Sequence, residues 1–595
     1  MDNPSAPSDP AASPYRFILR AGNRLIPVIP AFVVYLFAVY MVFHAHGLPD
    51  YDYWDMFPSL LSDGGFNLSL GAFYTSSNEH VVALTKIFYL LNYLATGGDN
   101  FGLSVIACTF SLIIAACLAL VLARSARSRA ERICLGLLAA IAAFTPMAAH
   151  NFFMGMSGIA WLGANMFAVA AAAMFMLSVN RGSIWTIAVA FLLAFLAGQM
   201  YSTGVMAMIA VGIQGLLSDR TRRIGAAFLF CGAVYLLAIY LAQRVPGGHG
   251  HRIFDIQALA TFSLTFIGAA LTNTHSLALL WGGVGIACFL ALAYRYLRRQ
   301  DVGDRAAGAF CIGICVFVFM NAGIAAIGRA GMGGDAFAMA SRYASLPSLF
   351  WISLLGLALS LRARAADGVS IHGFGLGGAT LLGGVLALTA ISEAKPRVDA
   401  LIQRGETKNL AGLALSLGVR DDKTINAFVT PAPSQIYAAL PDLRAIHHVP
   451  FNHDLGCPSL GSRVQTGPDS TSPVITGHLD FAEAVGDGWF RVRGWALSAQ
   501  DAQPPLVADS WPADRVLCLA LIDANGLVVG SGIGGESRPD VARAYQRGEA
   551  SFGWNGYANP RISGFLFNGD RKLYAAVKDP SGAWIRLPGN IELSR

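Results

Sequence analysis

Long apolar runs separated by short polar segments fill the first two thirds of the chain. A membrane-spanning helix needs about 20 mainly apolar residues. Eleven runs come close to that length, at residues 26–45, 103–123, 133–149, 157–178, 184–199, 201–217, 224–243, 275–294, 306–327, 345–361 and 371–391. Beyond residue 391 such runs stop. The pattern therefore predicts a polytopic α-helical membrane domain at 26–391, followed by a part that is soluble in water.

The pattern changes again near residue 474, where apolar and polar residues alternate in short segments. Trp489 to Trp495 and Val516 to Ile522 are two such segments, and turn residues such as Asp523 to Gly526 separate them. Alternation with a period of two indicates half-buried strands. We expect a β-sandwich at 474–595. A helical and irregular connector at 392–473 would join it to the membrane domain.

Composition agrees with a membrane protein and narrows the range of partners. Of the 595 residues, 55% are hydrophobic and 13% are charged, whereas a soluble globular protein carries about 25% charged residues. The formal charge is +6, but the Lys and Arg residues gather in clusters between apolar runs. A nucleic-acid-binding face would need them along one surface. The pattern therefore predicts membrane lipid as a partner and excludes nucleic acid.

Positive charge predicts the orientation of the helices, because loops rich in Lys and Arg stay in the cytoplasm. The run Ile256 to Leu271 is apolar too, but counting it as a span would place the cluster at 295–299 outside. We therefore interpret it as an interfacial or re-entrant helix. The clusters that then lie inside are Arg16/Arg20/Arg24, Arg124/Arg127/Arg129/Arg132, Arg181, Arg220/Arg222/Arg223, Arg295/Arg298/Arg299 and Arg362/Arg364.

This orientation gives the chain a cytoplasmic N-terminus and a C-terminal domain on the other side of the membrane. Residues 1–25 form a cytoplasmic tail. The apolar run that follows is longer than a signal-peptide core of about 7–15 residues, so it predicts an uncleaved first helix. We expect a multi-pass protein of the bacterial inner membrane with a periplasmic C-terminal domain.

The first external loop, 46–102, gathers acidic groups and a histidine. Asp50, Asp52 and Asp55 follow the first span, and Glu79 and His80 precede an amphipathic stretch that runs to residue 94. A carboxylate beside a membrane has a raised pKa, which suits a group that accepts a proton from a hydroxyl. An ordinary polar loop at the membrane surface would look the same, and the loop alone does not decide between these interpretations.

Aromatic residues lie between the acidic ones. Tyr53 and Trp54 offer flat faces for a sugar ring, or anchors at the level of the lipid headgroups.

The arrangement resembles the GT-C integral membrane glycosyltransferases. The shared features are a first helix with its N-terminus inside, a long first external loop with an acidic motif, a surface helix behind it and about ten further spans. The resemblance covers residues 15–450 as architecture. It implies transfer of a sugar from a polyprenyl-phosphate donor to a glycan or lipid acceptor outside the cytoplasm, usually with inversion. It also implies that Asp52 or Asp55 is the catalytic base, with Asp50 less favoured because it is nearest the helix end.

Arginines in the external loops are candidates for binding the donor phosphate, because Arg forms charge-assisted hydrogen bonds with phosphate oxygens. Arg342 and Tyr343 precede a span at the end of the external loop 328–344, and Arg329 begins that loop. Arg252 lies in another external loop, after His249 and His251. An interfacial Arg-Tyr anchor is the alternative reading, but arginine outside runs against the charge rule, so we favour phosphate binding, above all by Arg342.

Cysteines and histidines show no spacing typical of a metal site. Seven of the nine cysteines fall inside apolar runs, where Cys usually packs as a small hydrophobe. The other two, Cys457 and Cys518, could pair, because the external compartment permits disulfides. No residue set specifies a cofactor, and a divalent metal stays open.

Three other functions stay open beside the glycosyltransferase. A glycan ligase or polymerase would rely on external Arg and His rather than on carboxylates. A transporter or flippase of lipid-linked sugars would carry charged residues deep in its spans, and few are visible. A non-catalytic envelope assembly scaffold would display the C-terminal domain. That domain either binds glycan through exposed aromatic rings or buries them in its core.

Overall fold

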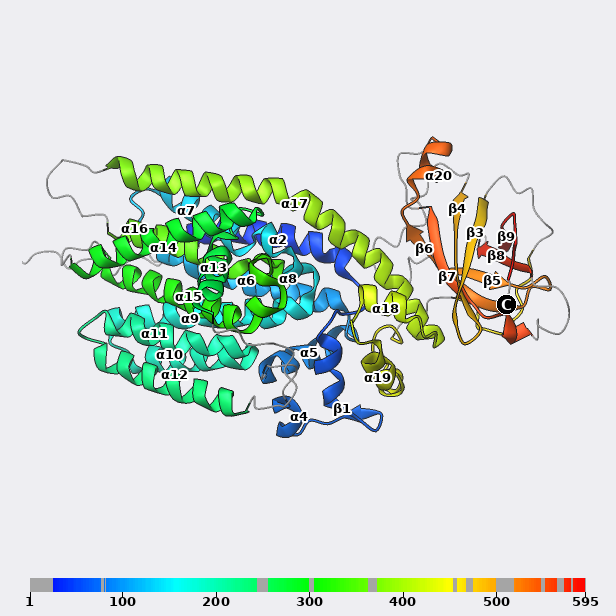
Figure 1. The fold of residues 1–595 in the computed structure, drawn as a ribbon, viewed down its shortest axis with the longest axis horizontal. Coiled ribbons are helices and arrows are strands. Elements are labelled where there is room, and N and C mark those ends of the chain that lie inside the picture. Colours follow the sequence, from blue (N-terminus) through cyan, green and yellow to red (C-terminus); the bar gives the residue numbers. More distant parts are fainter. Residues whose placement is uncertain are drawn as a thin grey trace, which may run out of the picture.

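The computed structural model describes residues 25–75, 80, 82–242, 255–298, 304–361, 372–452, 457–466, 475–498, 518–546, 552–563, 572–578 and 582–593. Figure 1 shows a bundle of long helices beside a curved β-sheet. One helix, α17 (His372–Leu417), runs along the bundle and on toward the sheet.

Each of the eleven predicted spans falls on a helix. Seven helical segments are long and apolar enough to cross a membrane, and the shorter apolar helices include Ile26–Val42, Ile184–Met200 and Ser202–Leu216. The chain is thus a mainly helical protein with transmembrane character. Beside α17, the helices at the predicted spans are α2 (Ile29–Val42), α6 (Asn100–Leu122), α7 (Arg129–Ala143), α9 (Gly155–Arg181), α10 (Ile184–Met200), α11 (Met206–Leu216), α12 (Arg222–Ala242), α14 (His275–Arg298), α15 (Arg305–Gly333) and α16 (Ser345–Ser360).

Burial separates central helices from peripheral ones. In the apolar stretch that contains α16, 94% of the residues are buried inside the protein, against 22% in the apolar stretches of α12 and α14. Large apolar side chains on the peripheral helices are exposed, as Phe230 on α12 and Leu290 on α14 show. Such surfaces suit contact with lipid tails, which are as apolar as the side chains.

Contacts between helix ends define two opposite ends of the bundle. At one end, Arg124 pairs with Asp304 at 2.7 Å, and the Tyr296 hydroxyl donates to the Arg305 carbonyl. At the other end, the Asn100 amide donates to the carbonyls of Ala45 and Phe153, and Thr85 to that of Met200. The first end carries basic residues and the second carries the first external loop. Successive spans therefore alternate in direction, as the charge rule predicts, whereas the orientation in a membrane stays a prediction.

The apolar run after residue 255 forms α13 (Ile256–Gly268), which is too short to span alone. At 1.5 Å per residue its 13 residues extend about 20 Å, against about 30 Å of bilayer hydrocarbon. Glycines let it pack closely on α14: a Cβ on Gly268 would lie 1.8 Å from the Ala278 carbonyl oxygen, and one on Gly282 1.9 Å from that of Leu264. Whether α13 is re-entrant or interfacial stays a prediction.

The segment predicted as the external loop 328–344 is largely helical. α15 continues to Gly333 and ends where Gly334 adopts a left-handed conformation with φ of 61°. The 3₁₀ helices η7 (Gly334–Met339) and η8 (Ser341–Tyr343) follow directly. Arg329 therefore lies on α15 and not in a loop. The sequence suggested a break because four glycines occur within 328–334, but only the last of them ends the helix.

Short elements fill the first external loop and the other connections. The predicted amphipathic stretch after His80 forms α5 (Ala83–Thr96), which buries Tyr89 and exposes Leu91 and Leu94. The other short helices and strands here are α3 (Tyr53–Met56), α4 (Leu70–Tyr74), α8 (Ala149–Phe153), β1 (Leu61–Ser62) and β2 (Gly65–Phe66). The remaining 3₁₀ helices are η1 (Ile26–Val28), η2 (Phe43–Ala45), η3 (Pro58–Leu60), η4 (Ala123–Ser125), η5 (Pro146–Ala148), η6 (Ser202–Val205) and η10 (Pro560–Ser563).

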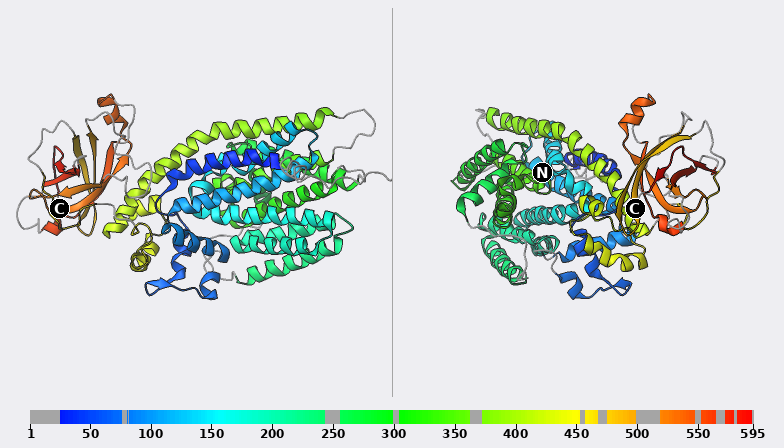
Figure 2. Two further views of the ribbon diagram at one scale, coloured as in Figure 1. Left: turned by 180° about the vertical axis from the view of Figure 1, so that it is seen from behind. Right: turned by 45° about the vertical axis from the view of Figure 1, so that its right-hand side comes forward.

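Helix α17 links the bundle to the C-terminal part. Its 46 residues correspond to about 69 Å, so it continues well beyond the predicted end of the last span at residue 391. Figures 1 and 2 show its second half leaving the bundle toward the sheet. There α18 (Asp422–Phe428) and α19 (Pro433–Ala445) complete the helical part of the predicted connector.

The C-terminal strands form one curled antiparallel sheet and not the two packed sheets of the predicted sandwich. The hydrogen-bonded order is β10-β8-β5-β6-β7-β4-β3, with β9 paired to β8. The edge strands β3 and β10 contact each other, which folds the sheet around its own core. The strands are β3 (Ile475–Gly486), β4 (Trp489–Ser498), β5 (Cys518–Ile522), β6 (Val528–Glu536), β7 (Gly553–Ala558), β8 (Lys572–Lys578), β9 (Trp584–Arg586) and β10 (Ile591–Glu592), and α20 (Pro539–Ala544) follows β6.

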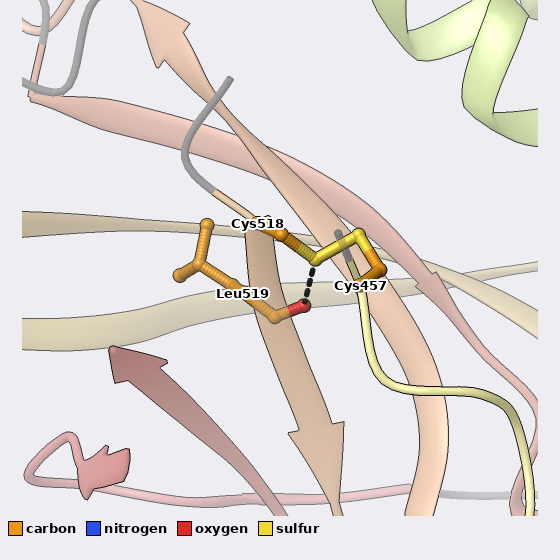
Figure 3. The surroundings of a disulfide bond; sticks show 3 residues. All are labelled: Cys457, Cys518 and Leu519. Atoms are coloured by element: carbon orange, nitrogen blue, oxygen red, sulfur yellow. Dashed lines mark hydrogen bonds between the residues drawn. A yellow bond between two sulfur atoms is a disulfide. The ribbon is translucent and has the colours of Figure 1, made fainter. Parts of the chain in front are cut away.

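The predicted disulfide is present. Cys457 and Cys518 are bonded, with their Cα atoms 5.4 Å apart (Figure 3). The bond ties the segment before β3 to the start of β5. Disulfides persist in oxidising compartments, which agrees with the predicted extracytoplasmic location of this domain.

A buried polar network and an apolar cluster hold the sheet against α17 and α18. The Tyr557 hydroxyl donates to the Asp421 carboxylate at 2.8 Å, and Arg491 donates to Asp421 and to Thr424. Beside this network, the apolar cluster joins Leu410, Leu413, Ala414 and Val419 to Ile533 and Tyr557. The sheet is therefore docked on the helical part through desolvated contacts and not merely tethered to it.

Candidate functional site

The acidic segment after α2 is fixed by hydrogen bonds to its own backbone and to the connector. The Trp54 indole donates to the Pro49 carbonyl at 2.9 Å, and the Tyr51 amide donates to the Val429 carbonyl at 2.7 Å. Tyr51 adopts a left-handed conformation with φ of 45°. This turn starts α3, so Asp52 and Asp55 sit on a rigid base at the external end of the bundle.

Asp50 is fully buried and forms an ion pair with α17. The Lys408 ammonium lies 2.6 Å from one carboxylate oxygen, and Arg404 Nε lies 3.7 Å from the other. Arg404 also donates to the Tyr51 hydroxyl at 2.9 Å. A fully buried carboxylate that faces two cations of α17 is shielded from an incoming substrate. Asp50 therefore positions the loop on α17, and the structure gives no support to its predicted contact with substrate.

Tyr53 and Trp54 are core residues and do not offer free faces to a sugar. Their exposed fractions are 0% and 1%. The Tyr53 hydroxyl is 2.8 Å from His448 Nε2, and its ring packs on Phe57 and Tyr89. The predicted stacking platform for a sugar is therefore wrong. The connector packs against both rings through His448, and nothing in the sequence indicated this contact.

His448 is neutral and has fixed hydrogen-bonding roles. Its ring is fully buried, and burial lowers its pKa to about 4, against the smaller opposing effect of its hydrogen bond to the Val449 backbone. Nδ1 lies 2.7 Å from the Val449 carbonyl oxygen and therefore carries the proton. Nε2 then accepts from the Tyr53 hydroxyl. His448 thus stabilises the base of the acidic loop.

Asp52 belongs to a polar cluster at the mouth of the bundle. Its negative charge acts on Tyr89, Tyr201 and Arg342. The pKa of Tyr201 is raised chiefly by burial, then by Tyr343 and Asp52, while the positive charges of Arg329 and Arg342 lower it. The predicted base and both predicted arginines of segment 328–344 therefore converge around one tyrosine that the sequence analysis did not single out.

His80 contacts this cluster through Tyr201. His80 Nε2 is 2.7 Å from the Tyr201 hydroxyl, and the two rings lie 4.0 Å apart between centroids. Burial, followed by the positive charge of Arg329, lowers the pKa of His80 to about 3. His80 is therefore neutral near pH 7 and acts there as a hydrogen-bonding group and not as a cation.

Arg342 is held over aromatic rings at the start of the α16 region. Its guanidinium carbon lies 5.0 Å from the Phe337 ring centroid and 5.1 Å from that of Tyr343. The backbone beside it is fixed, because Asn151 donates to the Arg342 carbonyl at 2.9 Å and Ser341 to the Met147 carbonyl at 2.6 Å. Such stacking orients the planar guanidinium, which also donates a hydrogen bond to the Tyr343 side chain. Arginine carries five N–H donors, so its fork can engage an anion in addition.

Tyr343 is buried and closes the cluster from the side of the bundle. It is 3% exposed, and its ring lies 5.1 Å from Trp161 and 5.6 Å from Phe266. Trp161 in turn contacts Tyr201, at 4.5 Å between centroids. The rings of Trp161, Tyr343 and Phe266 therefore line one side of the cluster, and Tyr343 supports Arg342 through packing.

Further positive charge lies beside this cluster. The charges of Arg404, Asp50, Arg397 and Arg342 all act on His150 at the start of α8. Arg397 pairs with Glu393 at 3.0 Å. The cations of α17 and Arg342 thus act on one region at this end of the bundle, where Asp50 and Glu393 offset part of the charge of Arg404 and Arg397.

Several predicted residues are not placed in the cluster. Glu79 and Arg252 lie outside the described residues, as do His249 and His251. Asp55 is half-buried in the first turn of α3. Two cavities are found elsewhere, one in the C-terminal domain and one between the end of α17 and α19. Among the described residues, no group of His, Cys, Asp or Glu is arranged to hold a metal ion.

The sequence analysis missed Tyr201, Arg404, Lys408 and His448. Arg404 and Lys408 are four residues apart, so they lie on one face of a helix. Cations at that spacing after the last apolar run were a usable signal, but their partner Asp50 is more than 350 positions away. Tyr201 lay in a turn between two apolar runs and carried no motif.

No protein-family model, curated protein or solved structure matches this chain.

Proposed function

We propose that the protein is a membrane glycosyltransferase that moves a sugar from a polyprenyl-phosphate donor to a glycan or lipid acceptor outside the cytoplasm. The observation that carries this proposal is the convergence of Asp52 with Arg342, around Tyr201, at one end of an apolar helical bundle. A carboxylate and a stacked arginine at the level of the lipid headgroups combine a proton acceptor with a phosphate ligand.

The reaction assigns one role to each group. Asp52 accepts the proton of the acceptor hydroxyl while the acceptor oxygen attacks the anomeric carbon. The bond between that carbon and the phosphate oxygen breaks, and Arg342 stabilises the negative charge of the departing polyprenyl phosphate. Attack opposite the leaving group inverts the anomeric configuration. Asp55 is the second candidate for the base.

Tyr201 and His80 would orient the site. Neutral His80 is hydrogen-bonded to the Tyr201 hydroxyl, which fixes a phenol that feels the charges of Asp52, Arg329 and Arg342. Arg329 contributes positive charge at the end of α15 and is the second candidate for contact with the phosphate.

The proposed topology has eleven spans, with the N-terminus in the cytoplasm and the C-terminal domain in the periplasm of a bacterial cell. Support comes from the separation of the helix ends, since Arg124, Arg295 and Arg305 belong to the end opposite the first external loop. In this topology the donor reaches Arg342 from the outer leaflet.

A glycan ligase or polymerase is the second candidate, because arginines and histidines also converge here. Arg329, Arg342, His80 and His150 surround the same region. In such an enzyme His80 would take over the role of the carboxylate. The two candidates therefore differ in which substitution, that of Asp52 or that of His80, removes the base.

The test is a donor saturation experiment with the purified protein in mild detergent. A panel of polyprenyl-phosphate sugars is supplied together with an extract of envelope glycans and lipids as acceptor. Released polyprenyl phosphate is measured for wild type, Arg342→Ala, His80→Phe and Asp52→Asn. We expect Arg342→Ala to raise the donor concentration for half-maximal rate by about tenfold or more, because a hydrogen bond to a charged group contributes about 1.5–3 kcal/mol. Its maximal rate should fall as well, because Arg342 also stabilises the charge that develops on the departing phosphate.

His80→Phe should retain most of the maximal rate if Asp52 is the base. Loss of turnover in His80→Phe together with full turnover in Asp52→Asn would favour the ligase. Absence of donor consumption by the wild-type protein across the panel would contradict the glycosyltransferase proposal.

A further inference from the structure

A cavity in the C-terminal domain lies on the part of the sheet turned away from the membrane bundle. Its volume is about 410 Å³, within the range of about 300–1,000 Å³ typical of ligand pockets. Segment 457–466, tied to β5 by the Cys457–Cys518 disulfide, forms one wall, and β8 and β9 form the other. Figures 1 and 2 show β8 and β9 on the side of the sheet opposite the end of α17.

Trp584 provides a rigid aromatic wall. It packs against an apolar cluster of Val464, Ala520, Ile522, Val528 and Ala576 on the outer surface of the sheet, yet remains partly exposed and lines the cavity. An indole fixed on one side and accessible on another is suited to stack against the apolar face of a sugar ring, since its large apolar surface is already ordered.

Two cations are among the described residues that line the cavity. They are Arg463 and Lys578, and the Lys578 ammonium lies 5.4 Å from the centroid of the Trp584 ring. Ser462 and Gln465 also line the cavity and can hydrogen-bond to hydroxyl groups. Arg463 and Lys578 are both exposed, so their charges are open to a ligand in solution.

We propose that this cavity binds acidic sugar units of an extracytoplasmic glycan. An indole beside two cations matches a pyranose that carries a carboxylate, because the ring stacks while the carboxylate accepts charge-assisted hydrogen bonds from Arg463 and Lys578. Strands β8 and β9, which contribute to the wall of the cavity, lie on the side of the sheet opposite the end of α17 (Figure 1), so a polymer is favoured over a lipid headgroup. This inference does not depend on sugar transfer, and binding at this cavity can be measured without a donor.

The test is a binding titration of the full-length protein in detergent with oligogalacturonate, an acidic oligosaccharide, against maltotetraose as a neutral one. We expect wild-type protein to bind oligogalacturonate, and to bind it more weakly at high salt because exposed charges are screened. Trp584→Ala should weaken binding about tenfold. The double variant Arg463→Gln/Lys578→Gln should weaken it at least as much while leaving maltotetraose unaffected.

Matched controls are Arg543→Gln and Tyr545→Ala, an exposed cation and an exposed aromatic residue near α20 in the same domain. Both should bind as wild type does. Because Trp584 also packs in the domain, the double variant of exposed residues tests the site without disturbing the core. Unchanged binding in that double variant, equal affinity for both oligosaccharides, no binding by wild type, or binding only to vesicles of anionic lipid would each overturn the proposal.

Discussion

The ion pair between Asp50 and Lys408 offers a strong test of how the acidic loop is held. Asp50 is 0% exposed and the Lys408 side chain is 5% exposed, with 2.6 Å between their charged atoms. Replacing Lys408 by Met keeps the length of the side chain but removes the charge. The carboxylate then remains buried and faces the Nε atom of Arg404 at 3.7 Å.

The size of the effect follows from this geometry. Breaking a buried ion pair by removing one partner costs about 3–5 kcal/mol, whereas replacing both charges is often close to neutral. Because Arg404 still faces Asp50, we expect Lys408→Met to lose about 3 kcal/mol, at the lower end of this range. The double variant Asp50→Asn/Lys408→Met should recover most of that loss, since no unpaired carboxylate remains.

The assay is urea unfolding in mild detergent, followed by tryptophan fluorescence. Trp54 belongs to the same loop and is buried at 1% exposure, so loss of the loop's contacts changes its environment. Wild type, both single variants and the double variant form a double-mutant cycle. Equal stability of Lys408→Met and wild type, or a double variant as unstable as Lys408→Met, would refute the argument that α17 holds the loop through this pair.

Three further predictions concern pH, the disulfide and topology. Because the pKa of His448 is lowered from 6.5 to about 4, its contribution to stability is complete above pH 6.5 and is lost as the pH falls toward 4. The loss amounts to about 3 kcal/mol. The free energy of unfolding, measured between pH 7.5 and 4.5, should therefore decline more steeply for wild type than for His448→Gln. His80, whose pKa is also lowered, is present in both proteins and contributes equally to both curves. Parallel curves would contradict the prediction. The variant Cys457→Ser/Cys518→Ser should lose about 4 kcal/mol in the C-terminal domain, from the 61-residue separation of the cysteines; unaltered thermal melting with and without reductant would disprove it. Reporter fusions after residue 400 should show periplasmic activity, and cytoplasmic activity there would overturn the eleven-span topology.

The sequence predicted those features that depend on local pattern. Apolar runs predicted the helices, and alternation predicted strands such as β4 and β5. The pairing of Cys457 with Cys518 followed from the expected oxidising compartment. Each of these signals lies within one segment or follows from the environment of a whole domain. A single sequence is therefore sufficient to predict the features that depend on them.

Features that depend on long-range contacts were not predicted. The closing of the sheet through contact of β3 with β10 joins segments about a hundred residues apart, and nothing local distinguishes it from a sandwich. The burial of Tyr53 and Trp54 depends on the connector, through His448. Asp52 was predicted as a base through the resemblance to a family, and Arg342 as a phosphate ligand through its position against the charge rule. Tyr201, on which both charges act, had no sequence signal.

The rate of sugar transfer by Asp52→Asn at saturating donor tests the central claim most directly. The carboxamide keeps the shape of the side chain but cannot take up the acceptor's proton, so the rate should fall by about 10²–10⁴-fold, with expression and folding nearly unchanged. Asp63→Asn is the matched control, because Asp63 is an exposed residue of the same loop in a left-handed conformation, which Asn also tolerates. That control should turn over as wild type does. Wild-type turnover by Asp52→Asn would remove this carboxylate from the mechanism, and wild-type turnover by Asp55→Asn as well would contradict a catalytic base on the first external loop.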